Sequence, residues 1–185
     1  MSNQLTVAAR FLISTLSNMA LVLFILRILL QWARSDFYNP ISQLVFRATN
    51  PVVAPLQRAL PRSRVIDLPC AIVLAALTAA TNFLLMRLVG VSTPPGEFIY
   101  YVFARIVHLG ILVYVIAIIV DVVLSWIGQR GMHPMSRAIS TLTSPILNFF
   151  RRIIPPLGGL DFAPLVAILV LQTASILLPL PALFR

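Results

Sequence analysis

The stretch NPISQLVFRATNPVVAPLQRALP, residues 39–61, is matched 94 positions later by HPMSRAISTLTSPILNFFRRIIP, residues 133–155. The two stretches align without a gap, and several coinciding residues are prolines, whose ring restricts the backbone. The coinciding pairs are Pro40 with Pro134, Ser42 with Ser136, Thr49 with Thr143, Pro51 with Pro145, Arg58 with Arg152 and Pro61 with Pro155. The register continues outward to Trp32 with Trp126 and to Asp67 with Asp161. The chain therefore contains an internal repeat.

Apolar blocks flank both stretches, and each is long enough to cross a lipid bilayer, which takes roughly 20 apolar residues of helix. They cover residues 9–32, 68–89, 98–127 and 162–183. Hydrophobic residues make up 59% of the chain and charged residues only 10%, whereas soluble domains carry about 45–50% and about 25%. The sequence predicts an all-α integral membrane protein with four transmembrane helices.

The predicted architecture is two tandem units, residues 1–90 and 91–185, each built as helix, amphipathic linker and helix. Because each unit contains an even number of spans, both units enter the membrane from the same side. The repeat is therefore predicted to be parallel, with its axis along the membrane normal.

Each linker, residues 39–60 and 133–154, is predicted to form two short amphipathic helices at the membrane surface. Apolar stripes with helical spacing would face the lipid. They consist of Ile41, Leu44, Val45 and Ala48 in the first linker, and of Met135, Ala138, Ile139 and Leu142 in the second. The basic face would lie among anionic headgroups and comprises Arg47, Arg58, Arg137, Arg151 and Arg152.

Residues that favour helix N-caps stand just before a proline or a span at five places. They are Asn39, Asn50, Asp67, Ser144 and Asp161. Aromatic residues at the ends of the spans are predicted to anchor them at the membrane interface. These are Trp32, Trp126, Tyr100 and Tyr101.

Two charges lie inside the predicted spans at equivalent places of the repeat: Arg27 and Asp121. A charge in lipid is costly and is usually paired, so we expect these side chains to pair between the two units. Two other interpretations stay open. Arg27 could extend to the headgroups while Asp121 faces interfacial water, or the pair could handle ions or protons.

The sequence carries no signature of catalysis or of a bound cofactor. It has no phosphate-binding loop, no dinucleotide fingerprint, and neither a GxSxG nor an HExxH motif. A second axial ligand for haem beside His108 is missing, and the single cysteine lacks partners for a metal site. We expect no enzymatic activity, no cofactor and no metal.

The net charge of +9 comes from arginines, because the chain has no lysine. They lie between the apolar blocks, so membrane topology and anionic headgroups explain them better than nucleic acid does. Nine arginines fall on the linker side and four on the other. This bias predicts cytoplasmic linkers and external termini. Expected partners are anionic lipid headgroups, other membrane proteins and further copies of the chain.

Several motifs resemble the YggT family of small bacterial membrane proteins, which is also represented in plastids. They are RILLQW (residues 27–32), DVVLSW (residues 121–126), TNP (residues 49–51), TSP (residues 143–145) and RRIIPPLGGLDFAP (residues 151–164). The first unit departs from the last motif, since Arg64 and Val65 replace Gly158 and Gly159. The resemblance implies no enzymatic reaction. It implies associations with osmotic stress, with cytochrome assembly and with nucleoid or division organisation.

Two functional hypotheses follow. The chain is a scaffold or an assembly or stress-tolerance factor whose linkers dock partners, or it is a small oligomeric channel or transporter for ions or osmolytes. The repeated amphipathic linkers favour the first hypothesis.

The arginine distribution generates a topology prediction. A reporter that is active only in the cytoplasm should be active when inserted near Ser63 and silent when fused after Arg185. Reporter activity in whole cells is the measurement. The reverse pattern would overturn the orientation and leave the repeat intact.

Overall fold

A computed structural model describes residues 2–33, 39–59, 67–128, 133–154 and 161–184. Within these residues the chain folds into six α-helices and has no strand, so the expected all-helical fold is present. The helices are α1 (Ser2–Trp32), α2 (Pro40–Ala59), α3 (Leu68–Val89), α4 (Pro95–Trp126), α5 (Pro134–Ile153) and α6 (Ala163–Leu177).

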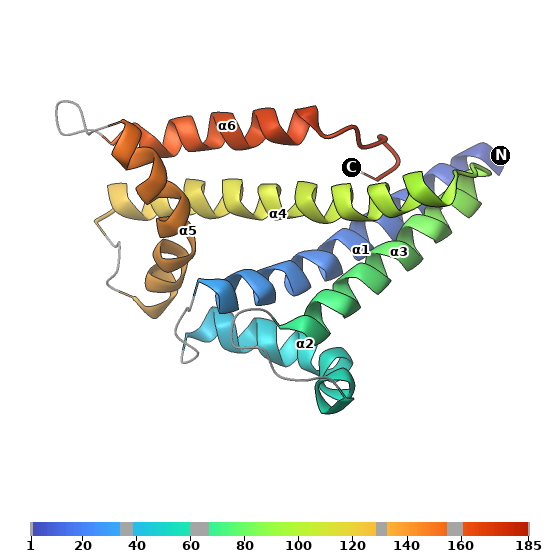
Figure 1. Cartoon of the computed structure of the whole chain (residues 1–185), viewed down its shortest axis with the longest axis horizontal. Coiled ribbons are helices and arrows are strands. Elements are labelled where there is room, and N and C mark those ends of the chain that lie inside the picture. Colours follow the sequence, from blue (N-terminus) through green and yellow to red (C-terminus); the bar gives the residue numbers. More distant parts are fainter. Residues whose placement is uncertain (1, 34–38, 60–66, 129–132, 155–160, 185) are drawn as a thin grey trace.

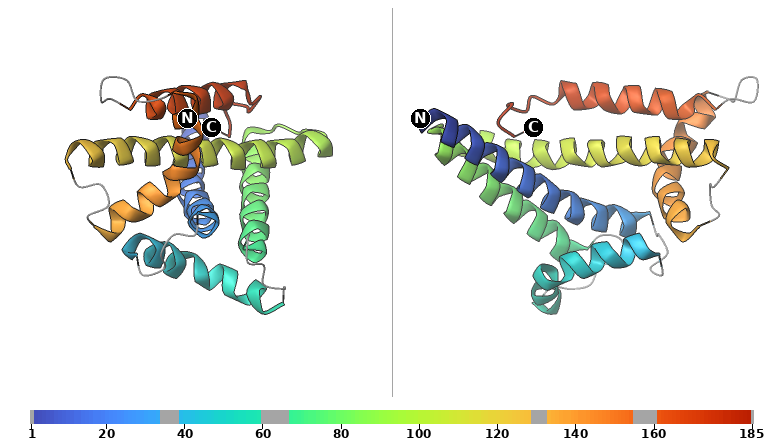
Figure 2. Two further views of the ribbon diagram at one scale, coloured as in Figure 1. Left: turned by 60° about the vertical axis from the view of Figure 1, so that its left-hand side comes forward. Right: turned by 180° about the vertical axis from the view of Figure 1, so that it is seen from behind.

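The helices form a bundle in which the two linker helices lie across helix ends (Figure 1). Helix α1 packs along α3, helix α4 packs along α6, and α1 and α3 both contact α4. The two further views place α2 and α5 toward one end of the bundle, while the N-terminus and the α3–α4 turn lie toward the other (Figure 2). The spacing of the helices repeats as well: α2 and α5 begin and end 94 positions apart, as do the ends of α1 and α4.

In the described part of the chain, three helices are long and apolar enough to cross a membrane. They contain the segments Gln4–Trp32, Leu68–Val89 and Pro95–Trp126. The predicted fourth span, residues 162–183, is helical only over the 15 residues of α6. At 1.5 Å per residue this helix is about 22 Å long, against a hydrocarbon core of about 30 Å. It ends early because Pro179 and Pro181 follow, and a residue that precedes a proline avoids the helical region.

Each linker forms one helix, which corrects the predicted pair of short helices. Asn50 and Ser144 lie inside α2 and α5 and do not cap a second helix. An internal proline lacks the N–H that would bond four residues back. In α5 this leaves the carbonyl of Thr141, and the hydroxyl of Ser144 donates to it at 3.0 Å. The helix therefore continues through Pro145.

The face of α2 that is buried against the protein combines hydroxyl-bearing and apolar side chains. Its fully buried side chains are Ser42, Val45, Thr49 and Val53. Leu44, predicted to face the lipid, is 64% exposed on the protein surface. The helix is oriented so that a hydroxyl-bearing face meets the spans. The buried face of α5 likewise includes Ser136 and Thr143, beside Ala138 and Leu142.

The segment after α6 returns to the bundle and packs at the end opposite the linkers. Leu180 and Phe184 are buried in one cluster with Leu85, Met86 and Ala104. Its backbone is also held from α1, because the guanidinium of Arg10 donates to the carbonyl oxygen of Ala182 at 3.2 Å. The C-terminal segment thus closes the bundle where α6 is too short to do so.

This packing predicts the effect of truncating Phe184. Phe184 is 1% exposed, whereas Phe103 on α4 is 63% exposed. Phe184→Ala should lower the free energy of unfolding by about 3–5 kcal/mol, because it leaves a cavity. Phe103→Ala should change it by no more than about 0.5 kcal/mol. Thermal unfolding of both variants in detergent tests this, and equal effects would show that the C-terminal segment is not part of the core.

Candidate functional site

A buried polar cluster joins α1, α2 and α3 at the linker end of the first unit. The guanidinium of Arg27 donates from Nε to Oδ2 of Asp67 at 2.9 Å and from Nη1 to the hydroxyl of Thr49 at 2.9 Å. Gln57 of α2 also donates to Asp67, at 3.4 Å. The side chains of Arg27 and Asp67 are only 2% and 7% exposed. Arg27 further stacks on the ring of Phe46, 4.6 Å from its centroid.

This geometry corrects the partner predicted for Arg27. The ion pair forms with Asp67 of the same unit and not with Asp121 of the other. The chain passes from α1 through the linker and re-enters the bundle at α3, so the carboxylate at the start of α3 arrives at the depth of Arg27. Spacing in the sequence favoured Asp121 only because the repeat places it at the equivalent position.

The second unit uses the same positions, with the arginine exchanged from the span to the linker helix. Asp121 replaces Arg27, and its Oδ2 accepts a hydrogen bond from Thr143 at 3.2 Å. Arg151 replaces Gln57 and pairs with Asp161 through Nε and Nη2, each at 2.8 Å. Two carboxylates cannot pair with each other, so in this unit the cation for Asp161 comes from α5. The aligned difference between Gln57 and Arg151 was the sequence signal that could have revealed this exchange.

Three of the residues singled out as helix caps bond to backbone N–H groups at helix starts. Oδ1 of Asn39 accepts from Ile41 at 2.8 Å, and Oδ1 of Asp67 accepts from Cys70 at 3.2 Å. Oδ1 of Asp161 accepts from Ala163 at 3.1 Å. Each of these carboxylates therefore has two roles, since its other oxygen holds an arginine.

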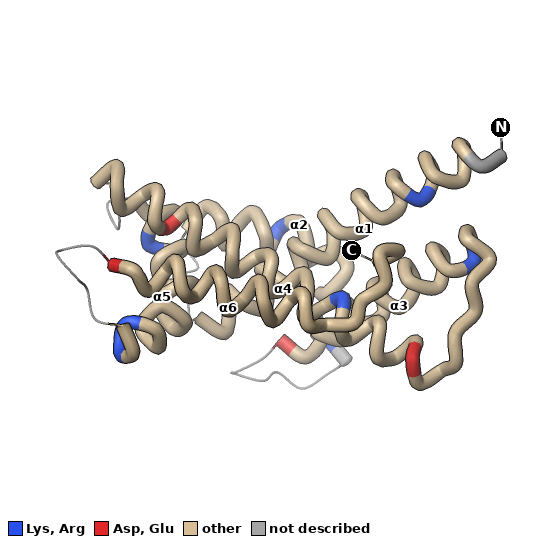
Figure 3. Tube along the Cα trace, turned by 90° about the horizontal axis from the view of Figure 1, so that it is seen from above, with Lys and Arg blue, Asp and Glu red and all other residues tan. Residues whose placement is uncertain are grey.

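The two linker helices also contact each other. The side-chain amide of Asn39, at the start of α2, donates to the carbonyl oxygen of Pro134, at the start of α5. Of the predicted basic face, Arg47, Arg58, Arg137 and Arg152 are exposed, while Arg151 is partly covered by its ion pair. Figure 3 shows how few charges lie along the rest of the bundle and how the arginines, in blue, gather on α5.

The predicted interfacial aromatic residues lie on the surface with one exception. Trp32 and Trp126 are 50% and 80% exposed, and Tyr100 is 36% exposed. Tyr101 is partly buried and packs against Phe184, with ring centroids 5.6 Å apart. Tyr101 therefore supports the C-terminal segment.

A third cluster, which the sequence reading missed, surrounds Arg105 of α4. Its guanidinium is fully buried and donates to oxygens of Asn18 and Asn82 at 2.7 Å each. It also donates to the hydroxyls of Ser17 at 3.1 Å and Thr81 at 3.2 Å. Arg105 is one of the four arginines that the topology prediction counts on the side opposite the linkers, and its burial removes it from that side. The available signal was the presence of adjacent polar pairs in two apolar blocks, Ser17–Asn18 and Thr81–Asn82.

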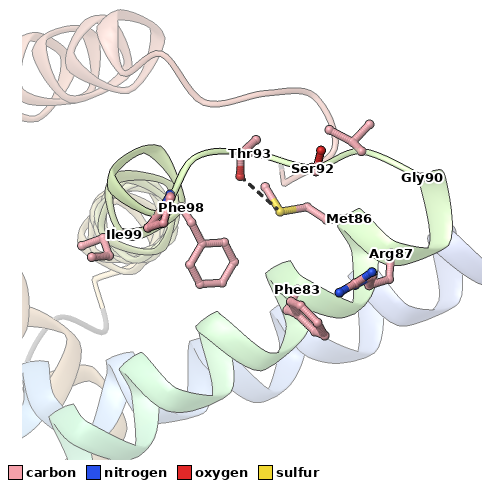
Figure 4. A pocket seen from close by; sticks show the side chains of 10 residues that line it. Phe83, Met86, Arg87, Gly90, Ser92, Thr93, Phe98 and Ile99 are labelled. Carbon is pink, nitrogen blue, oxygen red and sulfur yellow. Dashed lines mark hydrogen bonds between the residues drawn. The ribbon is translucent and has the colours of Figure 1, made fainter.

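A half-open pocket of about 670 Å³ lies at the α3–α4 turn, far from these linker clusters (Figure 4). Its walls include Phe83, Phe98 and Ile99, with Arg87 at its edge. The turn begins at Gly90, whose φ of 73° suits glycine. No group of His, Cys, Asp or Glu side chains in the described part of the chain could hold a metal ion. The pocket walls carry no acid–base pair.

Comparisons with known proteins identify relatives over nearly the whole chain. The family model for CCB3/YggT proteins matches residues 6–88 and 100–182, two segments that are also 94 positions apart. YggT of Escherichia coli K12 is 32% identical over 89% of this chain and 86% of that protein. A Pseudomonas aeruginosa protein is 34% identical over 94% of this chain and 89% of its own length. A Vibrio alginolyticus protein from the proC 3′ region is 37% identical over 91% of both. No solved structure matches the chain.

The two ion pairs generate a prediction about stability. Arg27→Gln or Asp67→Asn alone should lower the free energy of unfolding by about 3–5 kcal/mol, because each leaves a buried charge unpaired. The double variant should recover part of this loss. The matched changes Arg151→Gln and Asp161→Asn concern a pair that is 29% and 35% exposed, and should cost about 0–1 kcal/mol.

Double-mutant cycles on unfolding in detergent measure both coupling energies. Arg27→Gln combined with Asp121→Asn serves as a further control and should be additive. A larger coupling in that combination than between Arg27 and Asp67 would contradict the assignment.

Proposed function

The chain belongs to the CCB3/YggT family, and from this membership we propose that it is a non-enzymatic scaffold or assembly factor of the bacterial cytoplasmic membrane. Its working part is the linker surface, which we define as the outward face of α2 and α5. The proposed partners are anionic lipid headgroups and acidic cytoplasmic segments of other membrane proteins.

The proposed placement in the membrane uses α1, α3 and α4 as full spans and α6 with its following segment as a fourth, shorter one. Both units then run in parallel, with α2 and α5 at the cytoplasmic side and both termini outside. The arginine distribution supports this orientation, since nine arginines lie on the linker side and three on the other once the buried Arg105 is set aside. The position of α2 and α5 toward one end of the bundle supports it as well.

The observation that carries the proposal is that α2 and α5 are each hydrogen-bonded to a long helix of the bundle and are also bonded to each other. Thr49 anchors α2 to Arg27, Thr143 anchors α5 to Asp121, and Asn39 joins the two helices. Rigid attachment lowers the entropy lost when a partner binds. The linker helices are thus held in place as a platform.

The outward face of this platform combines apolar and basic side chains. Its exposed apolar residues are Leu44, Val52, Met135, Phe149 and Ile153, and its exposed arginines are Arg47, Arg58, Arg137 and Arg152. Amphipathic helices of this composition lie in the headgroup layer, with apolar side chains in lipid and arginines near phosphates. Guanidinium groups of such helices also bind the carboxylates of a neighbouring protein. A role in osmotic stress tolerance, cytochrome assembly or division would be exerted through such docking.

The proposal predicts a specific protein neighbour at the linker surface. A photoreactive residue in place of Val52, irradiated in intact membranes, should form a defined protein adduct. Arg47→Glu combined with Arg137→Glu should reduce that adduct about tenfold, because two charge contacts are reversed. Arg87→Glu, the same change at the opposite end of the bundle, should leave it unchanged.

Loss of the adduct in both variants, or its absence at Val52 when a photoreactive residue at Glu97 forms one, would contradict docking through the linkers. Purified protein in sealed vesicles provides the second arm. Protein-dependent flux of ions or osmolytes, together with no adduct at Val52, would replace the scaffold by the channel or transporter hypothesis.

A further inference from the structure

The cluster around Arg105 places a full positive charge inside the bundle. Arg105 and Asn82 are both 0% exposed. Arg105 lies 10 residues into α4, about 15 Å from the start of that helix. The four side chains that bind its guanidinium come from α1 and α3, and all four are neutral. Three helices therefore converge on one uncompensated cation.

The described acidic residues do not supply the missing negative charge. Within the described residues, Arg105 makes no ion pair with a carboxylate. Asp67 and Asp161 belong to the linker clusters, Asp121 accepts from Thr143, and Glu97 is exposed in the first turn of α4. Charged residues within membrane spans are costly and are normally paired. A counter-charge from outside the protein would meet this requirement.

Two buried donors in the same cluster point to where such a charge would bind. Among the described residues, Nε of Arg105 and Nδ2 of Asn82 have no hydrogen-bond partner. The Nη groups of Arg105 already donate to neutral acceptors. The Nε–H of Arg105 and the side-chain amide of Asn82 are therefore the donors that still lack an acceptor. Leaving such groups unsatisfied in a buried site is unfavourable, and both prefer an anion or another acceptor.

We propose that the Ser17, Asn18, Thr81, Asn82 and Arg105 cluster is a binding site for one small monovalent inorganic anion of the halide type. A single positive charge calls for a single negative charge. The complete burial of Arg105 and Asn82 excludes a lipid headgroup or a bulky organic anion. Nε of Arg105 and Nδ2 of Asn82, the two donors without a partner, would donate to the ion.

The test measures unfolding of the full-length protein in detergent in potassium bromide against potassium gluconate at constant ionic strength. Cys70 is the single cysteine and is 0% exposed, so a thiol-reactive fluorogenic dye reports unfolding. Binding to the folded state alone should raise the midpoint by about 3–5 °C for each tenfold increase in bromide above the dissociation constant. Equal midpoints in the two salts would overturn the proposal.

Two variants locate the effect. Arg105→Gln removes the cation, and Asn82→Asp supplies a carboxylate beside it; both should abolish the difference between bromide and gluconate. Asn82→Asp keeps the test decisive if Arg105→Gln does not fold, because the new carboxylate neutralises the guanidinium in place. Arg87→Gln is the matched control on exposed arginine and should retain the full bromide effect. A bromide effect that persists in Asn82→Asp would place the ion elsewhere and overturn the assignment.

Discussion

A polar group inside a lipid-embedded bundle has to find its partner within the protein, because hydrocarbon offers none. In the first unit, the ion pair between Arg27 and Asp67 meets this requirement and joins three helices. One oxygen of Asp67 binds Arg27 of α1, and the other accepts the backbone N–H of Cys70 at the start of α3. Arg27 in turn reaches Thr49 of α2. A single arginine and a single carboxylate thereby fix the end of one helix, the middle of the second and the start of the third.

The same constraint explains why the two units differ where the sequence repeat is otherwise regular. The second unit carries Asp121 at the place of Arg27, so the carboxylate before α6 needs a cation from another position. Arg151 provides it from α5. Because this pair lies nearer the surface, it contributes less stability than its buried counterpart. In the second unit α5 is also held through Thr143 and through the apolar contacts of Leu147.

The parts of this structure that could be read from the sequence are those governed by local rules. Apolar block length and helix-start residues predicted the helices, because they act over a few neighbouring positions. The partner of Arg27 could not be read in this way, since Asp67 lies 40 residues away and reaches it only through the path of the linker. The continuity of α5 through Pro145 was missed for a different reason. Its helix-breaking effect is offset by the Ser144 hydroxyl, which donates to the carbonyl that proline cannot reach.

The orientation of α2 reflects both its own sequence pattern and a contact with a residue distant in the sequence. Apolar periodicity predicts that Leu44 faces lipid, and the helix is oriented so that Ser42, Val45 and Thr49 face the spans, where Thr49 accepts from Arg27. Hydrophobic residues are thereby left on the outward side of a helix whose inward side is partly polar. In a soluble protein this arrangement would be unfavourable, because apolar side chains would meet water. At a membrane surface, where we propose that α2 lies, the consequence would be the opposite: buried hydroxyls satisfy the charges inside the bundle, and Leu44 and its neighbours face lipid or a partner.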